Sequence, residues 1–90
     1  QMNTKNILVD ASNCVYTSAD LTISTGYQIN DSNMRINVSF IKHVPTPILS
    51  SDGQGYGEMK PMRVANIDLD IQAAKILIDT LSMLISDAEK

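Results

Sequence analysis

The chain has 90 residues, of which 43% are hydrophobic, and a formal net charge of −3. This hydrophobic share is normal for a globular domain and argues against a disordered chain, while the length allows one domain with a modest core. The seven basic residues are scattered between Lys5 and Lys90, whereas proteins that bind a phosphate backbone concentrate positive charge on one face. We therefore expect a single domain over residues 1–90 and no nucleic-acid partner.

Cysteine usage and hydropathy indicate the compartment. Cys14 is the only cysteine, so an intrachain disulfide and a cysteine-based zinc site are both excluded. No apolar run approaches the roughly 18 residues that a membrane-spanning helix needs, and the start of the chain has no signal-peptide core. These features predict a cytoplasmic protein with no membrane partner.

Three segments in the first half of the chain suit β-strands. Residues 7–9, Ile-Leu-Val, form a short apolar run. Residues 21–29 alternate between apolar and polar side chains, and residues 34–44 alternate again, which is the period of a half-buried strand. Between them, the sequence Asn-Asp-Ser-Asn at 30–33 is strong turn chemistry. Residues 21–44 therefore predict an antiparallel hairpin with one solvated face.

A loop and a third strand are expected next. Pro45 and Pro47 lack the N–H group that a strand ladder needs, so they should end the second strand. Residues 46–61 show no periodicity and predict a flexible loop. Residues 62–70 resume an apolar alternation and predict the next strand.

The loop contains the glycine-rich stretch Ser-Ser-Asp-Gly-Gln-Gly-Tyr-Gly-Glu-Met-Lys-Pro, at residues 50–61. It lacks the lysine, the hydroxyl residue and the following helix of a P-loop, and its glycines do not have the spacing of a dinucleotide-binding loop. We expect a connection between strands, in which Tyr56 is the one plausible contact residue.

The last segment predicts a helix over residues 70–88, with Asp70 or Asp68 as the N-cap. At roughly 100° per residue, polar side chains gather in one stripe and apolar side chains cover an arc of about 220°, more than a helix needs to cover one sheet. The helix is therefore expected to be covered on two sides. The side that a second subunit would cover carries Ala73, Ile76, Thr80 and Met83, so we expect a homo-oligomer.

No combination of residues predicts catalysis. His43 is the only histidine, and nothing in the sequence brings it to Cys14. The acidic residues of the last third suit helix capping or the solvated helix face. We therefore predict no enzyme activity, no catalytic residue, no metal site and no cofactor.

Two segments resemble a family of short bacterial proteins known as domain of unknown function 3467. Residues 34–45, Met-Arg-Ile-Asn-Val-Ser-Phe-Ile-Lys-His-Val-Pro, are similar to that family's strand ending in Phe, here Phe40, followed by a Pro, here Pro45. Residues 62–81 are similar to its closing strand, capped turn and helix, with the Ala-Lys pair at Ala74 and Lys75. The resemblance covers about the last 60 residues and implies no known activity.

Together these features predict an α+β domain: a small antiparallel sheet of three to four strands with one C-terminal amphipathic helix packed on it. The function that we expect is that of a non-enzymatic, self-associating binding or assembly protein of a bacterium or phage, acting as adaptor or inhibitor of an unidentified protein partner. The alternative is a chaperone that holds unfolded chains, because strands followed by a long apolar helix also resemble, at the level of fold alone, the SecB-like export chaperones.

Overall fold

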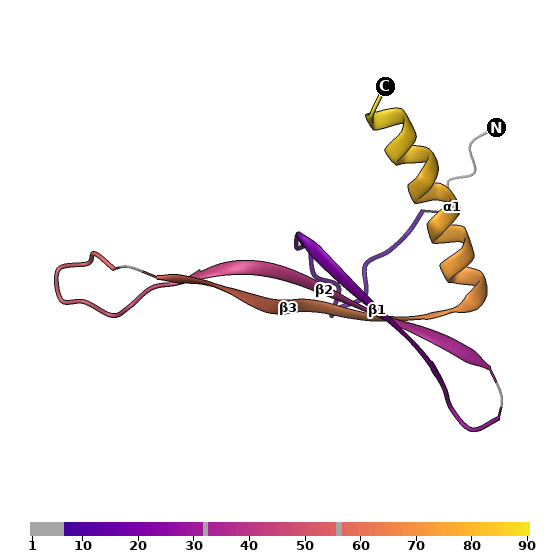
Figure 1. The fold of residues 1–90 in the computed structure, drawn as a ribbon, viewed down its shortest axis with the longest axis horizontal. Helices are drawn as coiled ribbons and strands as arrows, with labels where there is room; N and C mark the ends of the chain where they lie inside the picture. Colours follow the sequence, from indigo (N-terminus) through magenta and orange to yellow (C-terminus); the bar gives the residue numbers. More distant parts are fainter. Residues whose placement is uncertain (1–6, 32, 56) are drawn as a thin grey trace.

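Three strands and one helix follow one another along the chain (Figure 1). The computed structural model describes residues 7–31, 33–55 and 57–90. In these residues, β1 (Leu21–Gln28), β2 (Met34–Thr46) and β3 (Glu58–Asp70) form an antiparallel sheet in the order β1-β2-β3, and α1 (Ile71–Ala88) follows directly. The expected α+β fold, with a small antiparallel sheet and a C-terminal helix, is confirmed.

The β2–β3 hairpin is longer than the prolines suggested. β2 runs through Pro45 to Thr46 and β3 begins at Glu58, so the loop spans residues 47–57 instead of 46–61. Beyond the pair of Leu21 with Ile41, β2 has β3 as its only described neighbour. Each strand of this two-stranded section therefore has one edge without a neighbouring strand. A proline whose nitrogen faces that edge removes no hydrogen bond between strands. The expectation that Pro45 ends the strand was wrong for this reason.

The β1–β2 connection sets the register of the sheet. Gln28 pairs with Met34, which leaves five residues, 29–33, in the connection. The expected four-residue turn would have put Tyr27 opposite Ile36, whereas in the structure Tyr27 lies opposite Arg35. Shifting a strand by one residue moves all its side chains to the other face of the sheet.

Both faces of the sheet consequently carry apolar side chains, and the expected single solvated face is wrong. Leu21 and Ile23 of β1 lie on the same face as Ser39 of β2. The opposite face, which we call the apolar face, is formed by β2 and β3 through Met34, Ile36, Val38, Phe40, Ala65, Ile67 and Leu69. A sheet with this pattern exposes apolar surface on each side unless both sides are covered.

A bulge in β3 separates the three-stranded part of the sheet from the two-stranded part. Phe40 pairs with Ala65 and Ile41 pairs with Arg63, so Val64 is the extra residue. Such an insertion increases the local twist and bends the strand. The two-stranded section therefore leaves the sheet as a separate projection (Figure 1).

The N-terminal run Ile-Leu-Val at 7–9 is not a strand, which contradicts the sequence-based expectation. It pairs with no described strand, and Leu8 is 95% exposed. A strand needs a neighbouring backbone to satisfy its N–H and C=O groups. The apolar composition of residues 7–9 alone does not supply that neighbour.

Helix α1 begins where its sequence predicts. Asp70 Oδ1 accepts a hydrogen bond of 2.7 Å from the backbone N–H of Ala73, which satisfies one of the free donors of the first turn. At the other end, the Glu89 N–H donates to the Ile85 carbonyl at 3.1 Å. The helix contacts β2 and β3 and then extends away from the sheet (Figure 1). None of its residues is buried, and Ala74 alone is half-buried.

Replacing Asp70 with Ala should destabilise the protein by about 1 kcal/mol, because the cap that accepts from Ala73 is lost. The free energy of unfolding, measured by denaturant titration with circular dichroism, checks this. Asp70→Asn is the matched control, since Asn caps as well as Asp. Equal losses in both variants would contradict the capping role.

Candidate functional site

The side of α1 that we expected to contact a second subunit is exposed. Ile76 is 55% exposed and Met83 is 60% exposed, and Ala73 and Thr80 share this side by helical spacing. The Thr80 hydroxyl donates back to the Ile76 carbonyl at 3.0 Å. Its hydrogen-bonding need is met within the helix, which suits the residue to an apolar contact. We call these four residues the outer helix face.

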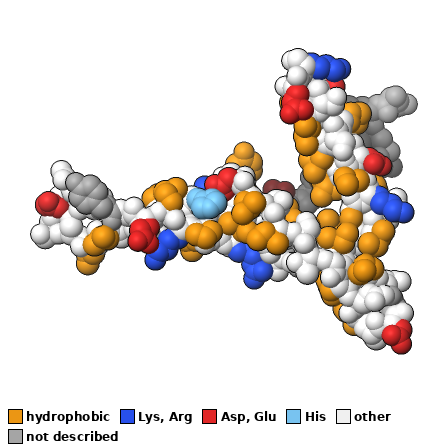
Figure 2. Space-filling model, viewed as in Figure 1, with side chains coloured by type: hydrophobic (Ala, Val, Ile, Leu, Met, Phe, Trp, Pro, Cys, Tyr) orange, Lys and Arg blue, Asp and Glu red, His pale blue; other side chains and the backbone are white. Residues whose placement is uncertain are grey.

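The side of α1 nearest the sheet is also poorly covered. It carries Ala74, Leu77 and Leu81, and both leucines are still exposed. Figure 2 shows hydrophobic side chains along α1 and the adjoining sheet. The apolar arc expected from the sequence therefore reaches solvent on both sides within one chain.

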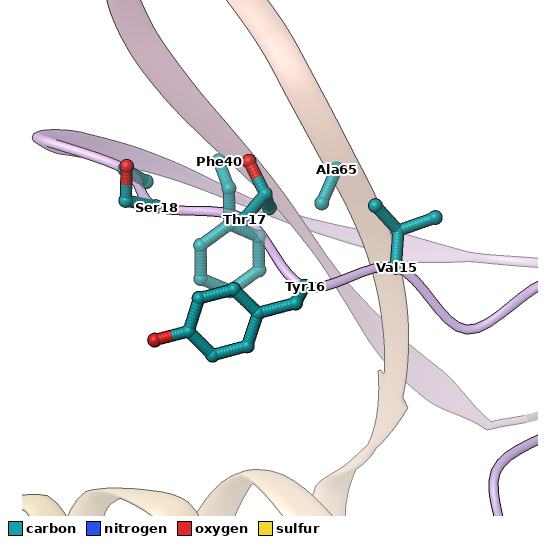
Figure 3. A pocket seen from close by; sticks show the side chains of 7 residues that line it. Val15, Tyr16, Thr17, Ser18, Phe40 and Ala65 are labelled. Carbon is teal, nitrogen blue, oxygen red and sulfur yellow. The ribbon is translucent and has the colours of Figure 1, made fainter.

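An open hollow of about 300 Å³ lies over the apolar face of the sheet (Figure 3). Its floor is formed by Phe40 of β2 and Ala65 of β3, and residues 15–19 pass over it. Val15 and Tyr16 line the hollow while remaining exposed. This segment covers the sheet only partly, so the hollow can accept an apolar side chain from another molecule.

The opposite face of the sheet carries a polar cluster around Asp68. Asp68 Oδ2 accepts from the Tyr27 hydroxyl at 2.6 Å and from Arg35 Nε at 2.7 Å. Asp68 Oδ1 accepts from Asn37 Nδ2 at 3.4 Å. The cluster joins one side chain of β1, two of β2 and one of β3, and so it links all three strands.

These hydrogen bonds change the acidity of the cluster. The Tyr27 hydroxyl, followed by Arg35, lowers the pKa of Asp68 below its ordinary value of 3.8. The same bond raises the pKa of Tyr27, because removing the phenolic proton would place two negative charges together. The Asp68 carboxylate is thus held in its charged form, and the cluster has the properties of a structural link between strands.

Asp20 connects the start of β1 to the two-stranded section. Its backbone N–H donates to the Ile41 carbonyl at 2.9 Å, and its carboxylate accepts from the His43 N–H at 3.3 Å. The His43 Nδ1 atom lies 3.3 Å from Asp20 Oδ2. The hydrogen bond from the backbone N–H of His43 lowers the pKa of Asp20. Among the described residues, no hydroxyl or thiol is hydrogen-bonded to the His43 ring.

The glycine-rich loop is a self-contained turn. The carboxylate of Asp52 accepts from the Ser50 hydroxyl at 2.5 Å and from the Gln54 N–H at 3.0 Å. Gly53 has a φ of +80°, and a Cβ atom on Gly57 would lie 2.5 Å from the Thr46 carbonyl oxygen. The glycines therefore serve backbone geometry, and a carboxylate at this position disfavours an anion. Tyr56, the expected contact residue, lies outside the described residues.

Other kinds of site are not found in the described part of the chain. Residues 7–31, 33–55 and 57–90 contain no group of three or more potential metal ligands. None of the helices in these ranges is long and apolar enough to cross a membrane. Cys14 is a free, exposed thiol.

Comparisons with protein-family models, with curated proteins and with solved structures find no match to this chain. The resemblance to domain of unknown function 3467 therefore stays a prediction. The candidate site rests on the geometry of the chain itself, and its main feature is uncovered apolar surface on α1 and on the sheet.

The Asp68 cluster should make stability depend on acidic pH. Because the pKa of Asp68 is lower in the folded state, its stabilisation is complete above pH 3.8, the ordinary value, and is lost as the pH falls through the folded pKa. Asp68→Asn should therefore lower the melting temperature at pH 7 and flatten its dependence on pH between 5 and 2, about the range in which a lowered carboxyl titrates.

Thermal unfolding followed by circular dichroism across this range checks the prediction. Glu89→Gln, at an exposed acidic residue just beyond α1, is the control and should show the wild-type dependence of melting temperature on pH. If Asp68→Asn and the wild-type protein lose stability in parallel below pH 4, about where free carboxyls titrate, the cluster does not stabilise the fold.

Proposed function

We propose that this chain is a non-enzymatic assembly protein that self-associates through its exposed apolar surfaces and acts by protein–protein contacts. The main support for this proposal is the large accessible surface of the chain. The accessible surface of the chain is 8257 Å², whereas a compact monomer of 9.9 kDa exposes about 5,200 Å². The excess is about 3,000 Å² per chain, by the same relation.

This excess exceeds the area that ordinary recognition covers. A standard interface buries about 800 Å² per partner, and permanent assemblies bury about 1,000–2,500 Å² per partner. The radius of gyration, 18.7 Å, is also well above the value of about 12 Å for a compact 90-residue domain. Both quantities support a chain that completes its fold in an assembly.

The burial of side chains supports the same proposal. Among the described residues, Val38 is the one hydrophobic side chain that is buried, with 8% exposed. Small domains are marginally stable because little apolar surface leaves the water. A second chain on the apolar face and on the outer helix face would supply the missing burial.

The wider role that we propose is that of an adaptor or inhibitor of a partner protein in the cytoplasm of a bacterium or of a phage-infected cell. The lone thiol Cys14 supports a reducing compartment, and the bacterial assignment rests on the resemblance to domain of unknown function 3467. A protein partner is favoured over a small molecule because the uncovered surface is broad and apolar.

A second candidate function is the holding of unfolded chains. The observation that favours it is the hollow over Phe40 and Ala65, which is open and apolar. Suppression of the aggregation of an unrelated unfolding protein at equimolar chain concentration would support this function. Failure to suppress aggregation, together with capture of one defined partner, would favour the adaptor.

Replacing both Ile76 and Met83 with Glu should weaken self-association at least about tenfold, because each side chain contributes roughly 1.5–3 kcal/mol when fully buried. Sedimentation equilibrium at several concentrations measures the dissociation constant. Ser86→Glu, on the polar stripe of the same helix, adds a charge outside the outer helix face and should leave the constant unchanged.

The melting temperature of the wild-type protein tests self-association without any variant. For the wild-type protein it should rise with protein concentration, since association stabilises only the folded chain. A melting temperature that is independent of concentration, with a monomer in sedimentation, would contradict self-association.

A further inference from the structure

The two-stranded section of the sheet forms an arm. It consists of Lys42–Thr46 of β2 and Glu58–Met62 of β3, beyond the last pair that β1 makes with β2. An isolated two-stranded hairpin is marginally stable in water and needs a surface against which to pack. In Figure 1 the arm extends from one end of β3, and α1 rises from the other end.

One face of the arm combines positive charge with apolar side chains. Lys42 lies opposite Met62, and Val44 lies opposite Lys60. These four side chains share one face by strand alternation, and they define what we call the arm face. Glu58 also lies on this side, but it is nearer the tip, beyond Lys60. The arm face therefore presents two lysines around an apolar centre.

The outer helix face carries the complementary pattern. At 100° per residue, Asp87 falls among the outer-face residues at the C-terminal end of α1, and Asp79 lies at their margin. The two carboxylates are separated by about 12 Å along the helix axis. Asp87 lies 3.4 Å from Lys90 Nζ in an exposed pair, and pairs of this kind contribute little and exchange readily.

The arm and α1 of one chain lie too far apart to contact each other in this way. Lys60 and Asp70 stand at opposite ends of β3, which is a strand throughout, and ten residues of strand span about 33 Å. Helix α1 rises away from the sheet at the Asp70 end (Figure 1). An arm that meets the outer helix face must therefore come from another chain.

We propose that the arm face of one chain packs on the outer helix face of a second copy, and that the second copy returns the same contact about a two-fold axis. Lys42 and Lys60 pair with Asp79 and Asp87. Met62 covers the apolar residues of the outer helix face. This inference rests on the proposed self-association and adds its partner surfaces and its symmetry. A reciprocal contact of this kind is closed, and so it limits the assembly.

Charge and apolar contact have different parts in this interface. The lysines are diagonal neighbours on the arm, with Cα atoms about 7–8 Å apart, and their flexible stems can reach carboxylates about 12 Å apart on a helix. Exposed ion pairs determine register and orientation more than affinity. Burial of Met62, Ile76 and Met83 supplies the favourable free energy.

A charge-exchange experiment tests the pairing. Lys42→Glu with Lys60→Glu should weaken self-association at least fivefold, and Asp79→Lys with Asp87→Lys should do the same. Mixing the two variants restores attraction at both contacts of a two-fold pair, because each arm then meets a helix of opposite charge. A single chain that carries all four substitutions restores both contacts, and its dissociation constant should return to within about threefold of wild type, the scatter of such measurements.

Control variants separate this pairing from a general charge effect. Arg63→Glu changes the same kind of charge next to the base of the arm, on the opposite face of the sheet, where Arg63 donates to the Ser39 hydroxyl at 3.3 Å. Glu89→Lys changes the carboxylate of the residue that follows α1. Both single variants should keep the wild-type dissociation constant, and circular dichroism shows whether each variant retains the wild-type fold.

Two outcomes overturn the proposal in distinguishable ways. In the first, the wild-type protein associates, but the charge reversals leave the dissociation constant unchanged, or the variant with all four substitutions does not regain wild-type association. The arm then does not contact the helix, although the proposal of self-association stands. If the wild-type protein is a monomer, the proposed function fails together with this inference. Recovery of association in the mixture and in the variant with all four substitutions, with unaffected controls, supports the reciprocal contact.

Discussion

The register between β1 and β2 determines which side chains lie on each face of the sheet. Five residues connect the strands, so Tyr27 lies opposite Arg35, and Leu21 lies on the face opposite to Val38. This alignment builds the polar link around Asp68 across all three strands. It also distributes apolar side chains over both faces of the sheet, which no single helix can cover. The Asp68 cluster links the strands on one face of the sheet, and the apolar face is covered only in part.

The helix follows from the same constraint. Asp70 ends β3 and caps α1, so the helix starts directly at the edge of the sheet. It contacts β2 and β3 and then leads away, with both apolar sides exposed. Helices in proteins are stabilised chiefly by packing of their apolar side, and α1 has little of that packing within one chain. Self-association would bury the apolar surface that this arrangement leaves in solvent.

Local patterns predicted the elements of this fold well. The alternation in 34–44, the Asp70 cap and the apolar periodicity of α1 are properties of neighbouring residues, and each of these elements is present. The width of the apolar arc on α1 predicted cover on two sides, whereas within one chain both sides remain exposed. Such signals lie within a few residues of one another, so they can be interpreted without knowing how strands pair.

Features that depend on strand pairing were not predictable in this way. The turn chemistry at 30–33 located the hairpin but not its register, and one residue separates the two alternatives. A proline ends a strand where its nitrogen faces a neighbouring strand, because the N–H donor is missing there. The nitrogen of Pro45 faces the edge of β2 away from β3, and the pairing with β3 continues through Pro45. The Asp68 cluster joins residues up to 41 positions apart, so its polar members looked like ordinary solvated side chains in the sequence.

The claim that joins these observations is that one chain does not complete its own fold. The molar mass in solution tests it most directly, measured by sedimentation equilibrium of the unmodified protein at low micromolar chain concentration. We expect a mass that is an integral multiple of 9.9 kDa, with two chains as the smallest unit. A mass of one chain at this concentration would contradict it.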